Sequence, residues 1–305
     1  RLLKHPNILP LVAVDDPTSY TDFRDVYLVT PLSDGDLTSL LEKRKWSLTD
    51  EEIRLLICQV LRALKFIHSG NVVHRDLKPG NILVDKNMHV QLCDLGLARY
   101  IDPEEEAGLT KNVTTKHYRA PEVMLCGDEY THAIDLWAVG CILFELLARR
   151  KIFEGLKFKS QVEAIFTIIG TPTEADTAFM HNDWGKWFIK RLPKHRPPSL
   201  KEQLPKDANQ DAVDLVSKLM VFDPHMRISA TDALKHPFLA PMHDEEKEPI
   251  LESSIPIEEY EPPTTNRDGS KMSKDDMKYL IWQEVARFNP GLEDRFNRRG
   301  RRHHH

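Results

Sequence analysis

The sequence has few of the features that mark membrane, secreted or nucleic-acid-binding proteins. Among its 305 residues, no stretch approaches the roughly 18 consecutive apolar residues that a membrane-spanning helix needs. The four cysteines are scattered and form no C-x-x-C pair, which disfavours a metal site and predicts reduced thiols in an intracellular protein. Residues 1–6 do not resemble a signal peptide. The formal net charge of −5 disfavours a surface that binds nucleic-acid phosphates or anionic lipid.

The composition is that of a globular protein, with 41 % hydrophobic and 29 % charged residues. The early segments 8–14 and 26–30 are rich in apolar and β-branched residues, so they predict strands. Later segments are helical in pattern, and residues 133–148 are apolar on every face, which is typical of a helix at the centre of a domain. Strands first and helices afterwards predict an α+β fold with a mainly helical body.

Hydrophobic spacing predicts the individual elements. Thr49–Glu52 is a helix-start signal, and the apolar residues from Ile53 to Ile67 recur at spacings of three and four, as in an amphipathic helix. Short strands are predicted at 82–84 and 90–93, on either side of a polar turn. Further predictions are helices around 159–169, 210–221 and 230–236, an extended surface segment over 241–271, and a helix over Lys274–Phe288 with Met277, Leu280, Ile281, Val285 and Phe288 on one face.

The most informative stretch is the octet His-Arg-Asp-Leu-Lys-Pro-Gly-Asn at His74–Asn81. Asp94-Leu95-Gly96 begins thirteen residues after Asn81, and Ala-Pro-Glu follows at Ala120–Glu122. Each tripeptide alone is weak evidence for a functional site, since a loop or a structural ion pair explains it equally well. The octet followed by both tripeptides in this order favours a functional site.

This set of residues suits phosphoryl transfer, in which the protein mainly positions the reactants and neutralises charge. Asp76 is placed to accept a hydrogen bond from an attacking hydroxyl, and Lys78 can offer positive charge to the transferred group. Asn81 and Asp94 supply oxygen atoms of the kind that Mg²⁺ prefers. We therefore predict Asp76, Lys78 and Asn81 as catalytic residues, and Asn81 and Asp94 as metal ligands.

These motifs resemble the catalytic half of eukaryotic protein kinases. Tyr118–Glu122, the insert at about 171–206, Phe222–Ile228 and the extension that ends near Phe288 resemble the mitogen-activated protein kinases in particular. The resemblance implies a protein-kinase-like fold and a serine/threonine kinase that uses ATP and Mg²⁺. It also implies protein substrates with Ser/Thr-Pro sites, an upstream kinase, a monomeric state, and a place in the cytoplasm and nucleus.

The resemblance also implies a division of the chain. Residues 1–31 are expected to be a remnant of the small β-rich lobe, namely the end of a helix and two strands. Residues 32–239 would form the helical lobe, with an activation segment over 94–122. Residues 240–288 would form a C-terminal extension with an acidic docking patch and a terminal helix, and residues 289–305 a disordered basic tail.

The segment around Thr30 resembles the hinge that binds adenine between the two kinase lobes. Thr30 falls at the position that limits the depth of the adenine pocket, Ser33 would donate its N–H to the ring, and Asp36 would contact the ribose. Pro31 has no N–H, but the family uses only the carbonyl there. Without the resemblance, this stretch predicts only an edge strand and a turn. The implied nucleotide-binding set is Thr30, Pro31, Leu32, Ser33, Asp36, Lys78, Asn81, Leu83 and Asp94.

Two residues are implied in substrate selection. Arg119 resembles the arginine that occupies a backbone carbonyl in the substrate site. The backbone N–H of the substrate residue that follows the phosphoacceptor then has no acceptor. This favours proline, which has no N–H, at that position. Thr115 matches the threonine that bridges the catalytic loop and the activation segment. Glu122 and Arg227 match a buried structural ion pair.

The activation segment departs from the family pattern, because members usually carry Thr-x-Tyr where this chain has Thr110-Lys111-Asn112. We therefore predict activation by phosphorylation of Thr110 alone, with Arg75 and Arg99 receiving the phosphate. A docking patch for basic peptides, including those of an upstream kinase, is implied at Asp244, Glu245 and Glu246. A solvated charged loop explains these carboxylates equally well from composition.

Some kinase elements are missing from the sequence. None of the thirteen glycines forms G-x-G, and no strand lysine precedes Leu2. We therefore expect a chain that lacks most of the small lobe and that binds ATP weakly or not at all. Two alternatives remain open: a pseudokinase or docking scaffold, and another proline-directed kinase such as a cyclin-dependent one. The retained Asp76 and Asp94 disfavour the first, and the extension over Pro249–Phe288 disfavours the second.

Overall fold

The computed structural model describes residues 3–15, 25–100, 116–127, 131–153, 157–196, 200–251 and 271–289. The chain divides into two compact units, which are described separately. The smaller unit comprises residues 1–4, 9–32 and 255–305, and the larger comprises 5–8 and 33–254. Among the described residues, no helix combines the length and the hydropathy that crossing a bilayer requires. The domain boundaries that the resemblance implied stay predictions.

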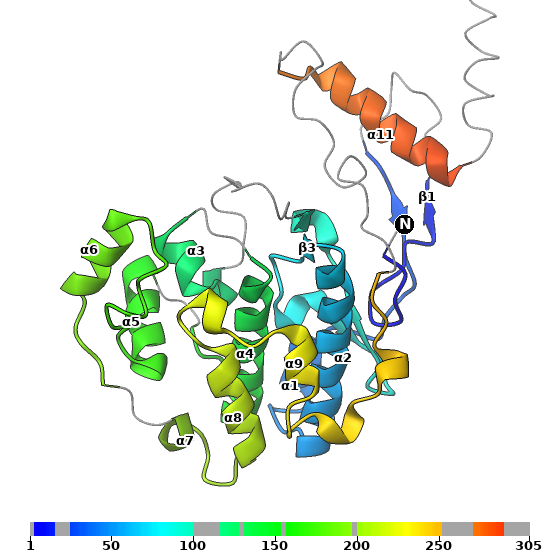
Figure 1. Ribbon diagram of the computed structural model, residues 1–305. Helices are drawn as coiled ribbons and strands as arrows, with labels where there is room; N and C mark the ends of the chain where they lie inside the picture. The colour runs from blue at the N-terminus through cyan, green and yellow to red at the C-terminus, as the bar shows by residue number, and fades with distance from the viewer. Residues whose placement is uncertain are drawn as a thin grey trace, which may run out of the picture. The chain divides into compact units, whose positions relative to one another are not determined.

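The larger unit is built around α2 (Asp50–Ser69), which lies against α4 (Ala133–Ala148) and α9 (Ala230–Leu234) (Figure 1). The start of α2 is fixed by a capping box. The Thr49 hydroxyl accepts from the N–H of Glu52 at 3.2 Å, and the Glu52 carboxylate accepts from the N–H of Thr49 at 2.8 Å. The apolar stripe from Ile53 to Ile67 is buried, so the helix predicted from its spacing is confirmed.

The α4 helix is buried on nearly all sides, as its sequence predicts, and it packs closely on α8 (Gln210–Leu219). Gly140 permits this close approach. A Cβ at that position would lie 2.7 Å from Cγ of Met220 and 3.0 Å from Cβ of Leu219.

The remaining elements of the larger unit are short. Its helices are α1 (Leu37–Lys43), α3 (Pro121–Leu125), α5 (Phe158–Ile169), α6 (Asp183–Arg191) and α7 (Leu200–Gln203). Its strands are β3 (Val72–Val73), β4 (Ile82–Val84), β5 (Val90–Leu92) and β6 (Arg99–Tyr100), paired antiparallel as β3 with β6 and β4 with β5. The predicted strands and helices are confirmed here, although the helix expected over 230–236 ends at Leu234.

The smaller unit contains β1 (Ala13–Val14), β2 (Leu28–Val29) and α11 (Lys274–Phe288). The two strands pair antiparallel, and Val14 forms a buried cluster with Trp282 and Val285. The side-chain amide of Asn289 donates to the carbonyl of Val14 at 2.9 Å, which ties the end of the helix to the strand.

Three sequence predictions need correction. The strands expected over 8–14 and 26–30 shrink to two residues each, and Pro10, which has no N–H to donate, interrupts the first. The start of the extended segment expected over 241–271 contains two 3-10 turns instead, η5 (Ala240–Met242) and η6 (Glu245–Lys247), and residues 252–270 lie outside the described residues. The buried face of α11 is also different, because Trp282 is buried while Met277 and Ile281 are exposed.

Candidate active site

The catalytic loop between β3 and η1 (Pro79–Asn81) is held in place by Asp135 of α4. The Asp135 carboxylate accepts from the backbone N–H of His74 at 2.9 Å and from that of Arg75 at 3.0 Å. Its Oδ2 also lies 2.9 Å from Nε2 of His68. This role was not predicted from the sequence, although Asp135 is one of two carboxylates in the apolar helix α4, which is a signal that it has a polar partner.

Asp76 lies at the centre of a hydrogen-bonded group within this loop. Nζ of Lys78 is 2.6 Å from Oδ2 of Asp76. The Asn81 side-chain nitrogen donates to the same carboxylate oxygen at 3.1 Å and to the Asp76 carbonyl at 2.8 Å. Asp76 and Asn81 are buried. The structure therefore brings together the three residues predicted to be catalytic.

The predicted metal ligands lie at the same end of the β4–β5 hairpin. Ile82 pairs with Leu92, and the N–H of Cys93 donates to the Asn81 carbonyl at 3.0 Å, so Asp94 directly follows the residue that lies across from Asn81. Asp94 has a left-handed backbone with φ 59°. A Cβ at Gly96 would lie 3.2 Å from Oδ1 of Asp94, so a glycine keeps space around this carboxylate.

The donor set at this hairpin end fits Mg²⁺. The Asn81 amide nitrogen is engaged with Asp76, which leaves the amide oxygen as the candidate ligand beside the exposed carboxylate of Asp94. Within the described residues, no group of three His, Cys, Asp or Glu side chains could hold a metal. A site with few protein ligands suits Mg²⁺, which keeps several of its waters.

The neighbouring Cys93 does not show the features of a reactive thiol. Burial, together with the negative charge of Asp94, raises the pKa of the Cys93 thiol. A raised thiol pKa lowers the thiolate fraction near neutral pH. Cys93 is therefore an unreactive thiol directly after β5.

The candidate nucleotide-binding residues fall in both units. Thr30, Pro31 and Leu32 belong to the smaller unit, and their contacts with a nucleotide stay predictions. In the larger unit, Asp36 forms an isolated antiparallel bridge with Leu83, so these two lie next to each other. The Asp36 carboxylate also accepts from the N–H of Ser39 at 2.8 Å and caps α1.

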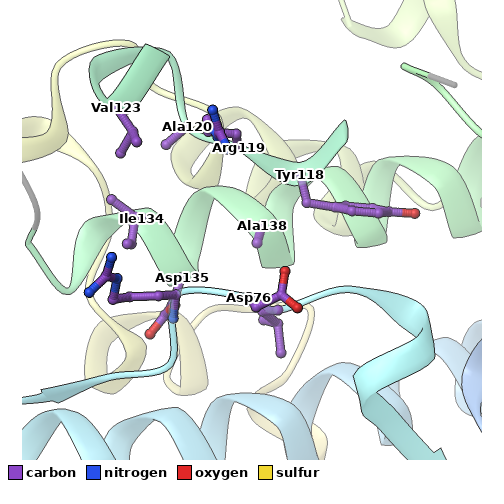
Figure 2. A pocket seen from close by; sticks show the side chains of 10 residues that line it. Asp76, Tyr118, Arg119, Ala120, Val123, Ile134, Asp135 and Ala138 are labelled. Carbon is purple, nitrogen blue, oxygen red and sulfur yellow. The ribbon is translucent and has the colours of Figure 1, made fainter. Parts of the chain in front are cut away.

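Arg119 lines a small pocket together with Asp76, and Figure 2 shows both side chains. In that view Tyr118 points away from Arg119, and the Tyr118 hydroxyl donates to Oε2 of Glu145 at 2.9 Å. Arg119 and the candidate base therefore line the same pocket, and the role of Arg119 in substrate selection stays a prediction. Thr110 and Thr115 lie outside the described residues, and the predicted phosphate contacts of Arg75 and Arg99 stay predictions.

The expected ion pair between Glu122 and Arg227 is confirmed. Arg227 donates to both Glu122 carboxylate oxygens, at 2.7 Å and 3.0 Å, and both side chains are buried. The same guanidinium donates to the Ala133 carbonyl at 2.6 Å. The pair therefore links the start of α3 to the start of α4, close to Asp135.

The candidate docking patch is partly neutralised. Nζ of Lys247 lies 2.6 Å from Asp244, and this hydrogen bond lowers the pKa of the Asp244 carboxyl. Glu248 is buried instead, with Lys65 at 3.1 Å and His243 at 2.9 Å. Peptide binding by Asp244, Glu245 and Glu246 stays a prediction.

Comparison with known proteins adds an independent finding. A family model described as the protein kinase domain matches residues 1–239. Mitogen-activated protein kinase homolog NTF6 of Nicotiana tabacum is 38 % identical over 288 residues, which cover 94 % of this chain and 74 % of the relative. Mitogen-activated protein kinase 1 of Oryza sativa subsp. japonica is 40 % identical over 295 residues, 96 % of this chain and 70 % of the relative. Mitogen-activated protein kinase 3 of Arabidopsis thaliana is 39 % identical over 291 residues, which cover 95 % of this chain and 75 % of the relative.

Proposed function

The chain belongs to the mitogen-activated protein kinases, which are protein serine/threonine kinases, and from this premise we propose that it phosphorylates Ser/Thr-Pro sites with ATP and Mg²⁺. The observation that carries the proposal is the hydrogen-bonded group of Asp76, Lys78 and Asn81. This group contains a carboxylate, a cation and a candidate metal ligand within one loop, a combination that suits phosphoryl transfer.

Asp76 accepts a hydrogen bond from the substrate hydroxyl and orients its oxygen toward the γ-phosphorus. As the new O–P bond forms, the bond to the β-phosphate oxygen breaks, ADP leaves, and the hydroxyl proton passes to the Asp76 carboxylate. Lys78, already 2.6 Å from Asp76, offers positive charge to the transferred group. Asn81 and Asp94 would hold Mg²⁺, whose charge offsets that of the phosphate oxygens.

Selection of proline is proposed to depend on Arg119. This residue lines the same small pocket as Asp76, so a substrate residue next to the phosphoacceptor passes close to it. If Arg119 occupies the local carbonyl acceptor, a backbone N–H at that substrate position is left without a partner. That loss disfavours every residue except proline.

Regulation is proposed to follow the family pattern in a reduced form. Phosphorylation of Thr110 by an upstream kinase would activate the protein, and Asp244, Glu245 and Glu246 would recruit basic docking peptides. Lys247 reduces the negative charge of that patch, so recruitment is expected to be weaker than three unpaired carboxylates would give. Action as a monomer in the cytoplasm and nucleus belongs to the same proposal.

One experiment tests the reaction. The protein is incubated with Mg·ATP, at a concentration high enough to offset weak nucleotide binding, and with either a Ser-Pro peptide or its Ser-Ala counterpart. The Asp76→Asn variant is the control. We expect phosphate incorporation into the Ser-Pro peptide, little into Ser-Ala, and a loss of about 10²- to 10⁴-fold for Asp76→Asn. Equal phosphorylation of the two peptides would refute proline selection.

A docking scaffold is the second candidate function. It would keep the helical body and the exposed carboxylates of Glu245 and Glu246 as a docking surface, and would dispense with nucleotide. For the 305 residues as given we propose weak ATP binding. Calorimetry that shows micromolar affinity for ATP would contradict this, and absence of phosphate transfer to every peptide would favour the scaffold.

A further inference from the structure

A cluster of exposed aromatic side chains lies at the start of α5 and along α6, at one end of the larger unit (Figure 1). The ring of Phe158, the first residue of α5, lies 6.1 Å from that of Trp184 and 5.5 Å from that of Phe188, between centroids. Trp184 and Phe188 stack at 5.3 Å. Trp184 is 47 % exposed and the neighbouring Trp187 is 49 % exposed. Large apolar side chains that gather at the surface indicate a contact surface.

The geometry of α6 makes Trp187 project outward. An α-helix has about 3.6 residues per turn, so Trp187 lies on the opposite side of α6 from Gly185 and Ile189, its two buried residues. Gly185 fixes the helix against the body of the unit, because an added Cβ there would lie 2.7 Å from the carbonyl oxygen of Leu125. The indole of Trp187 therefore extends toward solvent from a helix that is packed closely on its other side.

The same helix and the segment after it are strongly basic. Residues 183–196 contain five lysines and arginines and one carboxylate, which gives a local formal charge of +4. Within the part of the chain that the structure describes, Lys186, Lys194 and Arg196 form no ion pair, and Lys190 pairs only with the exposed Glu174 at 3.9 Å. The net charge of −5, which disfavours anionic lipid for the chain as a whole, therefore does not describe this surface.

Aromatic rings and cations are combined here in a way that suits the membrane–water interface. The Arg191 guanidinium lies 4.0 Å from the centroid of the Trp187 ring, so a charge and an indole are held together. At a bilayer surface an indole enters the headgroup region, and nearby Lys and Arg side chains are attracted to anionic lipid. Aromatic anchors in protein–protein interfaces fill well-packed pockets instead. The outward direction of Trp187 therefore favours a lipid surface over an acidic protein.

We propose that α6 and the segment after it bind the surface of an anionic membrane. Trp184 and Trp187 enter the headgroup region, and Lys190, Arg191 and Lys194 lie against the anionic headgroups. Binding is peripheral and reversible, because the apolar contact is limited to a few side chains on a short helix. None of these residues belongs to the candidate active site, so the proposal does not depend on the proposed phosphoryl transfer.

Co-sedimentation of the full chain with vesicles tests the proposal. One set of vesicles is phosphatidylcholine alone, and the other is equal parts of phosphatidylcholine and phosphatidylserine. We expect binding to the second set, weakened by added salt, and little binding to the first. Lys190→Glu together with Lys194→Glu should weaken the binding by at least about tenfold. The control pair, Lys43→Glu with Lys235→Glu, reverses two other exposed lysines and should change the binding by less than about twofold.

A second variant tests the aromatic contribution. Trp187→Ala should weaken binding by about three- to tenfold, whereas Tyr279→Ala, which removes another half-exposed ring, should leave it unchanged. Absence of binding to the phosphatidylserine vesicles, equal binding to both sets of vesicles, or an equal loss in the two lysine pairs would overturn the proposal. Binding of labelled polyglutamate without binding of the vesicles would assign the surface to an acidic protein and would overturn it too.

Discussion

Among single residues, Asp135 connects the buried body of the larger unit to the candidate active site. Its carboxylate is 1 % exposed and uses both oxygens to hold the backbone of His74 and Arg75. Burial alone would raise the pKa of Asp135, but the hydrogen bond from His68 and the nearby histidine charges lower it. Asp76 follows Arg75 directly, so the position of the candidate base depends on this carboxylate.

Replacing Asp135 with Asn tests that dependence at the residue scale. The Asn side chain presents an NH₂ group where one of the two backbone N–H groups needs an acceptor, so a buried donor loses its partner. We expect the free energy of unfolding to fall by about 2–3 kcal/mol in urea denaturation. Asp207→Asn, which removes an exposed partner of Arg149, is the control and should cost under about 1 kcal/mol. Equal effects of the two variants would contradict the assigned role.

For the elements, the packing of α4 on α8 depends on one missing side chain. Gly140 faces Leu219 and Met220, and the two helices approach where it lacks a Cβ. Helix propensity alone favours Ala over Gly by about 1 kcal/mol. Whether Gly140→Ala lowers or raises the free energy of unfolding therefore shows whether packing or helix propensity dominates at this contact.

We expect packing to dominate, because a Cβ 2.7 Å from Met220 and 3.0 Å from Leu219 forces at least one side chain to move. Gly140→Ala should lower the free energy of unfolding by about 1–2 kcal/mol in urea denaturation. Gly35→Ala is the control, since its Cβ would meet Ser39 at an ordinary 3.7 Å. A Gly140→Ala protein as stable as the parent would show that the helices separate without cost.

Sequence periodicity predicted the long elements well for a physical reason. In α2 and α4 the burial of an apolar face outweighs other local preferences, so the spacing of apolar residues determines the helix. It predicted the bounds of α11 but not its whole buried face, where one large indole at Trp282 takes the buried place that a count of aliphatic residues assigned to Ile281. It also overextended the first strand, where Pro10 cannot donate a hydrogen bond.

The candidate site was predictable where its residues are close in sequence. Asp76, Lys78 and Asn81 belong to one octet, so their proximity follows from the chain itself. Asp135 lies 61 residues from His74, and nothing local in the sequence shows that α4 meets the loop.

At the scale of the whole molecule, the larger unit contains two histidines whose protonation opposes folding. Burial, with the nearby charge of Arg62, lowers the pKa of His5 to about 4. Burial, with the charge of His68, lowers the pKa of His132 to about 4, and the two rings of that pair lie 4.7 Å apart between centroids. An unfolded chain protonates such residues near pH 6.5, as model peptides do.

These two shifts predict a loss of stability in mild acid. Both folded pKa values lie below the unfolded value, so the unfolded state binds more protons as pH falls from about 6.5 to about 4, and the stabilisation present above pH 6.5 is lost in that window. Each histidine contributes at most about 1.4 kcal/mol per pH unit to this slope. Urea denaturation at about pH 7 and about pH 5 measures the difference in unfolding free energy between the two pH values. We expect His132→Gln to reduce that difference. His181→Gln, which removes an exposed imidazole, is the control. If His132→Gln keeps the full difference of the parent, the acid sensitivity arises elsewhere, because removal of a group that takes up a proton on unfolding must flatten the slope.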